Sequence, residues 1–127
     1  MQTVRGTGVV SIVDDDEGIR RALAGLMRSA GLMAEVFSTA EDFLASALAE
    51  RTACLVLDVH LHEMSGLELQ QRLIEAGRQV PIVFITAHDC ERARTLALET
   101  GAAFFLSKPL SGGALLACVR AAMGACR

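Results

Sequence analysis

Apolar residues in this chain gather into five short runs, separated by longer stretches in which apolar residues recur every three or four positions. The runs lie at residues 8–13, 34–37, 55–58, 82–85 and 103–106. The third is unbroken up to its final aspartate and the fourth is unbroken throughout, which is typical of strands buried on both faces of a central parallel sheet. The spacing between the runs is that of helices. The pattern therefore predicts five strands that alternate with five helices.

Helix start and stop signals fall between these runs. Asp16 can cap the first helix, which is expected to end at Gly31. Ser38 and Glu41 match a capping box that would open the second helix. The apolar face of that helix is expected to consist of Phe43, Leu44, Ala47 and Leu48. The other helices are predicted near residues 67–76, 91–100 and 115–122.

Strands and helices that alternate with short connections are the signature of an α/β fold, in which helices cover both faces of a doubly wound parallel sheet. At 127 residues the chain has the size of one domain. Internal repeats, low-complexity segments and interdomain linkers are absent from the sequence. We therefore expect a single domain over residues 1–127, with its core at about 8–123.

Composition narrows the class of protein. Hydrophobic residues make up 52% of the chain and the formal net charge is −3, which indicates a globular protein and argues against a nucleic-acid surface. No apolar run approaches the roughly 18 residues that a membrane span needs. Residues 1–8 carry a single arginine and no long apolar block, so no secretory signal is expected. We expect a cytoplasmic protein that contacts neither a membrane nor nucleic acid.

The four cysteines form no C-x-x-C pair; they are Cys54, Cys90, Cys118 and Cys126. With this spacing a zinc site is not expected. Cys54 falls in a predicted core strand, and nothing in the sequence supplies a base beside the exposed candidates. We expect reduced thiols without a catalytic role.

Polar side chains capable of chemistry follow four of the five predicted strands. The first strand ends at Asp14 and Asp15, the third at Asp58, the fourth at Thr86, and the fifth just before Lys108. The carboxyl ends of parallel strands lie along one edge of the sheet, where open α/β folds place their chemistry. The sequence therefore predicts that these side chains meet.

The chemistry of such a group of side chains is restricted. Neighbouring carboxylates raise one another's pKa values unless positive charge compensates them. Two sources are available, the Lys108 ammonium and a bound divalent cation, and an all-oxygen site suits Mg²⁺. A carboxylate beside Mg²⁺, a hydroxyl and a lysine is suited to receive a phosphoryl group, because phosphoryl oxygens need distributed positive charge and hydrogen-bond donors.

Five short motifs stand in order along the chain: Val13-Asp14-Asp15-Asp16-Glu17, Leu57-Asp58, Ser65-Gly66, Thr86-Ala87 and Lys108-Pro109. Together they resemble the receiver domain of two-component response regulators. The resemblance covers the chain from about Val9 to Ala122. It implies a flavodoxin-like (βα)5 fold with strand order 2-1-3-4-5.

The resemblance also implies a role for each site residue. Asp58 would be the phosphoacceptor that attacks the phosphohistidine of a sensor histidine kinase. Asp15 would bind Mg²⁺ directly and Asp14 through water, with Asp58 and the backbone carbonyl of His60 as the remaining metal ligands. Lys108 would pair with a phosphoryl oxygen.

The resemblance further implies a conformational switch. Thr86 would hydrogen-bond the bound phosphoryl group and move inward, which would vacate space for the aromatic Phe105. The Lys108–Pro109 peptide bond would be cis. The face formed by the fourth helix, fifth strand and fifth helix would change, and that face or the one formed by the first and fifth helices would serve a homodimer. The output would be transcription, through a C-terminal DNA-binding domain absent from this chain.

Several loop positions depart from the family pattern or are unusual. Leu61 and His62 stand where Met-Pro is common, which should loosen the loop. Phe104 replaces a frequent aspartate and should enlarge the apolar surface nearby. His60, His62 and His88 all fall in loops at the predicted site. They are solvent-exposed polar residues, or, for His60 and His88, residues that control the access of water to the phosphorylated aspartate, or together the ligands of a transition metal.

Alternatives of other classes fit the sequence less well. A free-standing receiver that acts through protein contacts would carry the same motifs. A haloacid-dehalogenase-type phosphatase also has a nucleophilic aspartate at a strand end, but it needs a second aspartate two residues on, where this chain has His60. A nucleotide-binding domain needs a G-x-G-x-x-G or P-loop motif after a strand, and the sequence has neither. The sequence favours a switch that phosphorylates and dephosphorylates itself, rather than a turnover enzyme.

Overall fold

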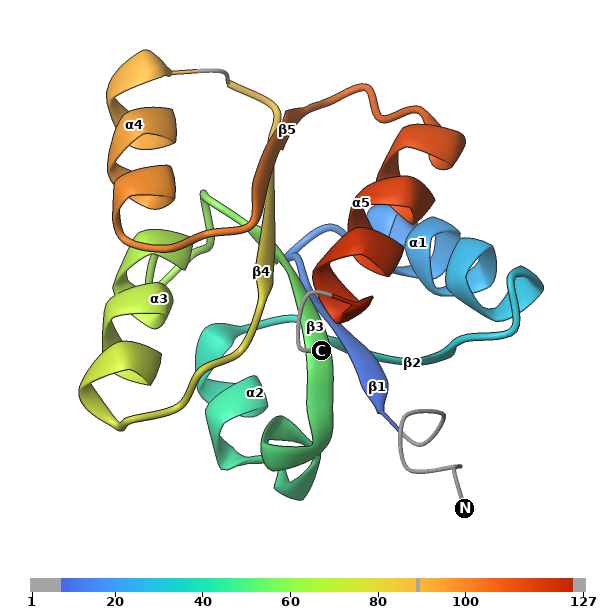
Figure 1. Ribbon diagram of the computed structural model, residues 1–127, viewed down its shortest axis with the longest axis horizontal. Coiled ribbons are helices and arrows are strands. Elements are labelled where there is room, and N and C mark those ends of the chain that lie inside the picture. Colours follow the sequence, from blue (N-terminus) through green and yellow to red (C-terminus); the bar gives the residue numbers. More distant parts are fainter. Residues whose placement is uncertain (1–7, 89, 125–127) are drawn as a thin grey trace.

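The computed structural model describes residues 8–88 and 90–124. Its five parallel strands form one sheet in the order β2-β1-β3-β4-β5, with helices on both faces (Figure 1). The strands are β1 (Val9–Val13), β2 (Met33–Phe37), β3 (Thr52–Asp58), β4 (Ile82–Thr86) and β5 (Phe104–Ser107). The helices are α1 (Glu17–Ser29), α2 (Ala40–Ala45), the 3₁₀ helix η2 (Ala47–Arg51), α3 (Gly66–Glu75), α4 (Glu91–Glu99) and α5 (Gly112–Gly124). The predicted fold class and strand order are confirmed.

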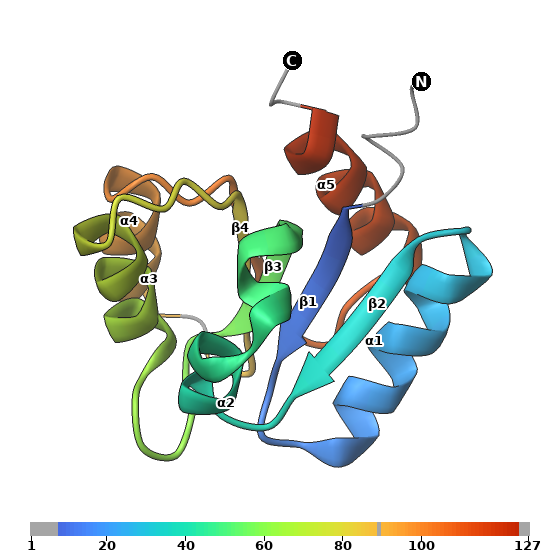
Figure 2. The same ribbon diagram turned by 90° about the horizontal axis from the view of Figure 1, so that it is seen from below.

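The sheet separates two apolar cores. Helices α1 and α5 cover one face, and α2, α3 and α4 cover the other (Figures 1 and 2). Strand β3 lies in the middle and contributes to both: Leu55 and Leu57 belong to the core under α2 to α4, whereas Cys54 and Val56 belong to the core under α1 and α5. All four are fully buried. The unbroken apolar run of this strand therefore follows from burial on both faces, which stabilises the fold by about 1.5–3 kcal/mol for each large side chain.

Several helix ends follow the sequence signals. The Asp16 carboxylate accepts a hydrogen bond from the Ile19 N–H at 3.0 Å and caps α1, as predicted. Gly31 and Gly77, which follow α1 and α3, have φ angles of 83° and 75°. These left-handed conformations favour glycine and end the helices at the expected places.

The start of α2 differs from the prediction. Its N-cap is Thr39, whose hydroxyl accepts a hydrogen bond from the Asp42 N–H at 3.0 Å. The predicted capping box of Ser38 and Glu41 is therefore wrong. Two adjacent hydroxyl residues offer two registers for the same cap, and the register that starts at Thr39 buries Phe43 completely.

The end of α2 also differs from the prediction. Ser46 has extended backbone (ψ 141°) and stops the α-helix after Ala45. The Ser46 hydroxyl then accepts a hydrogen bond from the Leu48 N–H at 3.0 Å and begins η2. The expected single apolar face is thus divided between a short α-helix and a 3₁₀ turn.

None of the helices in the described part of the chain is long and apolar enough to cross a membrane. Cys54 is buried in β3, Cys90 is an exposed free thiol, and Cys118 is a half-buried free thiol whose pKa is raised by burial. Cys126 lies outside the described residues.

Candidate functional site

Strand register brings the predicted site residues to one edge of the sheet. The last pair of residues between β1 and β3 is Val13 with Leu57. The next residue of each chain segment is an acid, Asp14 after β1 and Asp58 at the end of β3. Strands β4 and β5 pair with Thr86 opposite Ser107, which puts Lys108 just beyond the same edge. The side chains that the sequence distributes over ninety residues are therefore neighbours in space.

The Asp58 carboxylate is buried at the centre of this group, with the residue only 5% exposed. Its Oδ1 accepts a hydrogen bond from the His60 N–H at 2.9 Å, and its Oδ2 accepts one from Lys108 Nζ at 3.3 Å. Burial nevertheless raises the pKa of Asp58 above its ordinary 3.8, because burial and the charge of Asp14 outweigh the His60 hydrogen bond and the Lys108 ammonium. The charged carboxylate would be stabilised by further positive charge.

Asp14 is held more tightly than Asp58. The residue is fully buried, its Oδ1 accepts a hydrogen bond from the Asp16 N–H at 2.9 Å, and its Oδ2 accepts one from Lys108 Nζ at 3.1 Å. Arg20 donates from Nη1 to the Asp14 carbonyl oxygen at 2.7 Å. The position of this carboxylate is therefore fixed from both sides, and the supporting Arg20 was not anticipated from the sequence, where it is one of several charges on α1.

Among the described residues, Lys108 is the one cation whose side chain donates a hydrogen bond to these two carboxylates, and it serves both. Burial favours its neutral form, but the hydrogen bond to Asp14 and the charges of Asp58 and Asp14 outweigh burial, so the pKa of Lys108 is raised. One ammonium shared between two carboxylates explains why Lys108 is firmly charged while the pKa of Asp58 remains elevated. The Lys108–Pro109 peptide bond is cis, as expected.

The three acids are arranged to hold a cation. Carboxylate oxygens of Asp14, Asp15 and Asp58 lie within 4.8 Å of one another. The Asp15 side chain is 25% exposed, so the group opens to solvent on its side. Oxygen donors from several carboxylates, with access for water, suit a hard divalent cation. These residues fit the magnesium site that the sequence predicts; the contribution of the His60 carbonyl stays a prediction.

The loop that follows Asp58 is closed by Ser65 and Gly66. Ser65 and Glu68 form a reciprocal capping box that begins α3. The Gly66 N–H donates to the Val59 carbonyl oxygen at 2.9 Å. A Cβ atom at position 66 would collide with the backbone carbonyl of Asp58. The Ser-Gly pair therefore lets the helix start directly against the strand end that carries Asp58.

Thr86 lies at the site edge but its hydroxyl is turned to the backbone that follows. Oγ1 accepts a hydrogen bond from the His88 N–H and donates one to the His88 carbonyl oxygen, both at 3.1 Å. The residue is fully buried. Contact between this hydroxyl and a phosphoryl group would require these local bonds to be exchanged, so the role of Thr86 stays a prediction.

Phe105 is already inside the protein, with 6% exposure. Its ring lies 6.0 Å from the Phe84 ring, and the guanidinium carbon of Arg94 lies 4.9 Å from its centroid. The inward position that was expected only after phosphorylation is thus occupied in this structure, with Arg94 of α4 over the ring. Phe104, in contrast, is half-buried against the core under α1 and α5, so it adds less exposed apolar surface than expected.

The three histidines are all exposed, and each has a specific neighbour. His60 and His88 pack edge to face, with ring centroids 5.9 Å apart. His62 Nε2 lies 3.3 Å from Asp15 Oδ2. The sequence placed all three at the site, but it gave no sign of the contact between His62 and Asp15.

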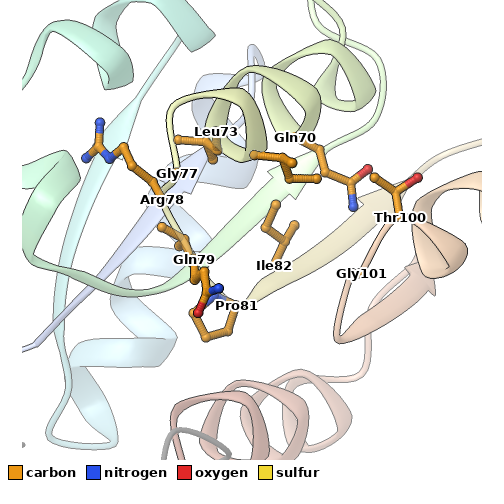
Figure 3. A pocket seen from close by; sticks show the side chains of 11 residues that line it. Gln70, Leu73, Gly77, Arg78, Gln79, Pro81, Ile82, Thr100 and Gly101 are labelled. Carbon is orange, nitrogen blue, oxygen red and sulfur yellow. The ribbon is translucent and has the colours of Figure 1, made fainter.

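A cavity of about 550 Å³ lies at the opposite edge of the sheet, between the ends of α3 and α4 and the start of β4 (Figure 3). Gln70 reaches across it, and its Nε2 donates to the Ala97 carbonyl oxygen at 3.0 Å. Apolar side chains make up much of the lining and no acidic residue contributes. This cavity therefore does not compete with the acidic edge as a cation or phosphoryl site.

The fold and the acidic site together define a class: a five-stranded α/β domain with three acids, a lysine and a threonine at the carboxyl edge of its sheet. Comparison with known proteins gives the family. Residues 10–120 match the model of the response regulator receiver domain. The chain therefore belongs to the receiver domains of two-component response regulators, as the motifs indicated. The haloacid-dehalogenase and nucleotide-binding alternatives are not favoured.

Individual relatives agree with this assignment. The chain is 43% identical over 115 residues to the response regulator protein TodT of Pseudomonas putida, covering 91% of this chain and 51% of that protein. It is 36% identical to the transcriptional regulatory protein FixJ of Azorhizobium caulinodans, covering 91% and 54%. The structure of FixJ-N superposes with a TM-score of 0.85 at 32% identity, covering 92% of this chain and 94% of that one. The chain thus spans about half the length of these curated relatives.

Proposed function

We propose that this domain is a phosphorylation-driven switch in which Asp58 takes a phosphoryl group from the phosphohistidine of a sensor histidine kinase. The observation that supports it most directly is the buried Asp58 carboxylate, incompletely compensated by Lys108 and close to the acids Asp14 and Asp15. Such a site gains stability when positive charge arrives, and it offers a nucleophilic oxygen at its centre.

The transfer itself needs little covalent chemistry from the protein. A carboxylate oxygen of Asp58 attacks phosphorus; the new O–P bond forms as the P–N bond breaks, and the kinase imidazole leaves with the electron pair. Asp14, Asp15, Asp58 and the His60 carbonyl would hold Mg²⁺, which when bound neutralises charge on the transferring group. Lys108 donates a hydrogen bond to a phosphoryl oxygen in place of one of its present carboxylate partners.

The switch uses Thr86. Its hydroxyl exchanges its hydrogen bonds with the His88 backbone for one to a phosphoryl oxygen. The loop between β4 and α4 moves with Thr86. A shift from 1:99 to 99:1 between two states requires about 5.5 kcal/mol. A hydrogen bond to a charged group contributes about 1.5–3 kcal/mol. Thr86 would gain such a bond, whereas Lys108 would exchange one charged partner for another, so the two contacts supply part of the required difference. Phe105 is already buried. Phosphorylation would therefore stabilise the present inward position of the ring and would not move the ring inward.

The output that we propose is control of transcription in the cytoplasm. It is supported by relatives about twice as long as this chain, among them transcriptional regulatory proteins named FixJ. A C-terminal DNA-binding domain would receive the signal through the α4–β5–α5 face, and that face or the α1–α5 face would form a homodimer. The domain phosphorylates itself from its donor and later hydrolyses the acyl phosphate, without turnover of another substrate.

Intact-mass spectrometry tests the proposal. The parent chain is incubated with Mg²⁺ and acetyl phosphate, and its mass should rise by one phosphoryl group. Asp58→Asn should abolish the gain, whereas Asp42→Asn, the same change at an exposed position, should leave it intact. Removal of Mg²⁺ with a chelator should suppress it. No gain in the parent, or an equal gain in Asp58→Asn, would contradict the proposal.

A further inference from the structure

We propose that Arg20 is a positioning residue for the acidic site, and that it raises the affinity of the site for Mg²⁺ by holding the backbone on both sides of Asp15. The inference rests on the proposed function of Asp14, Asp15 and Asp58 as a cation site. It assigns a role to a side chain of α1 that lies outside this group of carboxylates and acts on it through the backbone.

One hydrogen bond of Arg20 fixes the peptide unit that joins Asp14 to Asp15. Arg20 Nη1 donates to the Asp14 carbonyl oxygen at 2.7 Å, which is at the short end of the range for N–H···O bonds. The donor is a guanidinium, and a charged donor strengthens such a bond. Because a peptide unit is planar, a bond that holds its oxygen also holds the direction in which the chain enters Asp15.

The peptide units that follow Asp15 are fixed as well. The Asp16 N–H donates to Asp14 Oδ1 at 2.9 Å, and the Arg20 N–H donates to the Asp16 carbonyl oxygen at 3.0 Å. Arg20 therefore binds the carbonyl groups of the residues immediately before and after Asp15, one through its side chain and one through its backbone. These bonds restrict the backbone dihedrals that decide where the Asp15 side chain lies.

Asp15 depends on this backbone support more than the other two acids do. Asp14 and Asp58 are buried, and both accept hydrogen bonds from Lys108. The Asp15 side chain is 25% exposed, and its carboxylate pairs with His62, whose side chain is 81% exposed. An exposed ion pair holds a side chain only weakly. The place of the Asp15 carboxylate among the three acids therefore rests mainly on the backbone that Arg20 holds.

Arg20 has two effects on a bound cation, and they have opposite signs. As a nearby positive charge, its guanidinium repels Mg²⁺, so its removal on this ground would tighten binding. As a support for Asp15, it keeps a ligand in place for a cation that demands near-ideal geometry, so its removal would weaken binding. Groups that orient metal ligands typically change metal affinity about 10–100-fold. Arg20 is half-buried, so solvent and salt reduce the repulsion, and we expect the support to outweigh it.

A titration of the whole chain with Mg²⁺, followed by the amide signals in two-dimensional NMR spectra, tests the proposal. The signals report the dissociation constant Kd of the folded molecules, so a loss of global stability alone does not change it. Arg20→Met should raise the Mg²⁺ Kd about tenfold, and it should shift the amide signals of Asp15 and Asp16 before Mg²⁺ is added. Arg20→Gln, whose shorter side chain also lacks the charge, repeats the test if Arg20→Met does not fold.

Arg21→Met is the matched control. It removes the same charge from the next position of α1, where the side chain is exposed. Because an exposed charge is screened by solvent and salt, this variant should change the Mg²⁺ Kd less than about twofold. Its amide signals for Asp15 and Asp16 should stay close to those of the parent.

Phosphorylation by acetyl phosphate gives a second readout. The Mg²⁺ concentration that supports half of the maximal rate should rise in Arg20→Met by the same factor as the Kd, while the rate at saturating Mg²⁺ falls by a smaller factor. A lower saturating rate with an unchanged Mg²⁺ requirement would overturn the proposal, because Arg20 would then act on something other than the cation ligands.

The possible failures are distinguishable. A Kd of Arg20→Met equal to that of the parent, or lower, would overturn the role of Arg20 while the cation site of the proposed function stands. An equal weakening in Arg21→Met would also overturn it, because the hydrogen bond to the Asp14 carbonyl would then not be the cause. No binding of Mg²⁺ to the parent would remove the cation site itself, and with it the proposed function.

Discussion

The guanidinium carbon of Arg94 lies 4.9 Å from the centroid of the Phe105 ring, and Arg94 Nη1 also donates to the Phe105 carbonyl oxygen at 3.3 Å. One side chain of α4 thus contacts both the ring and the backbone of the residue at the centre of β5. The arrangement links the helix to the strand at the position where the proposed switch acts. It also covers the ring on the side that faces α4.

A double-mutant cycle measures this link. Arg94→Met and Phe105→Leu, alone and together, should give a coupling free energy of about 0.5–1 kcal/mol in urea unfolding, the size of a partly exposed cation–π pair. The cycle isolates the pair from the other contacts of either residue. Arg92→Met combined with Phe105→Leu is the control, because Arg92 is exposed on the same helix, and it should show no coupling. A coupling near zero for Arg94 would disprove the link.

The raised pKa of Asp58 predicts that its negative charge lowers the stability of the folded domain, by an amount that depends on pH. Because the folded state holds the proton more tightly than the unfolded state, the ionised carboxylate lowers stability increasingly as pH rises above 3.8. Asp58→Asn should therefore stabilise the cation-free domain at pH 7, by about 0.5–2 kcal/mol, and the gain should shrink as pH falls towards 3.8. Urea unfolding at several pH values measures it. A loss of stability at pH 7 would show that Asp58 is fully compensated.

Lys108 should weaken cation binding at the site as well as stabilise the carboxylates of Asp14 and Asp58. Lys108→Met removes the ammonium that donates to Asp14 and Asp58, so the cation-free domain should lose about 3 kcal/mol of stability, as expected for a buried charge left without its partner. The more negative site should then bind Mg²⁺ several-fold more tightly. Thermal unfolding with and without Mg²⁺ should show a larger stabilisation by the cation in the variant than in the parent. A smaller one would mean that Lys108 does not oppose the cation.

Gly66 should be intolerant of any side chain. Gly66→Ala places a Cβ against the carbonyl oxygen of Asp58 and close to the buried Phe84 ring. Neither neighbour can give way easily, so the domain should lose about 1–3 kcal/mol. Gly25→Ala makes the same change on the exposed face of α1, where no atom lies within 4 Å. That variant should gain about 0.5–1 kcal/mol, because alanine favours a helix. Similar effects at both positions would refute the packing explanation for Gly66.

The sequence was sufficient for the order of the elements and for the edge where the chemistry lies. The β3 strand could be predicted because burial on both faces requires an apolar run, and Asp58 because it ends that run. Contacts between side chains distant in the sequence could not be predicted. The pairing of His62 with Asp15 depends on the path of one loop, and that of Arg94 with Phe105 on the angle of one helix. Neither leaves a periodic signal.

The predictions also differed from the structure where a residue or its neighbour had two possible hydrogen-bond partners. Ser38 and Thr39 are both good capping residues, and the sequence does not distinguish them; the helix begins at Thr39 and buries Phe43. Likewise the Thr86 hydroxyl has two sets of partners, the His88 backbone found here and the proposed phosphoryl group. The sequence identifies the hydroxyl but not which partner it has before phosphorylation.

The most direct test of the central claim locates the phosphoryl group. After incubation with Mg²⁺ and acetyl phosphate, borohydride reduces an aspartyl phosphate to homoserine, and tryptic digestion places the altered residue. Asp58 lies in the peptide of residues 52–72, whereas Asp14 and Asp15 lie in the peptide of residues 6–20. The account predicts homoserine at position 58 and unaltered aspartates at 14 and 15. Homoserine at 14 or 15, or at no position, would contradict it.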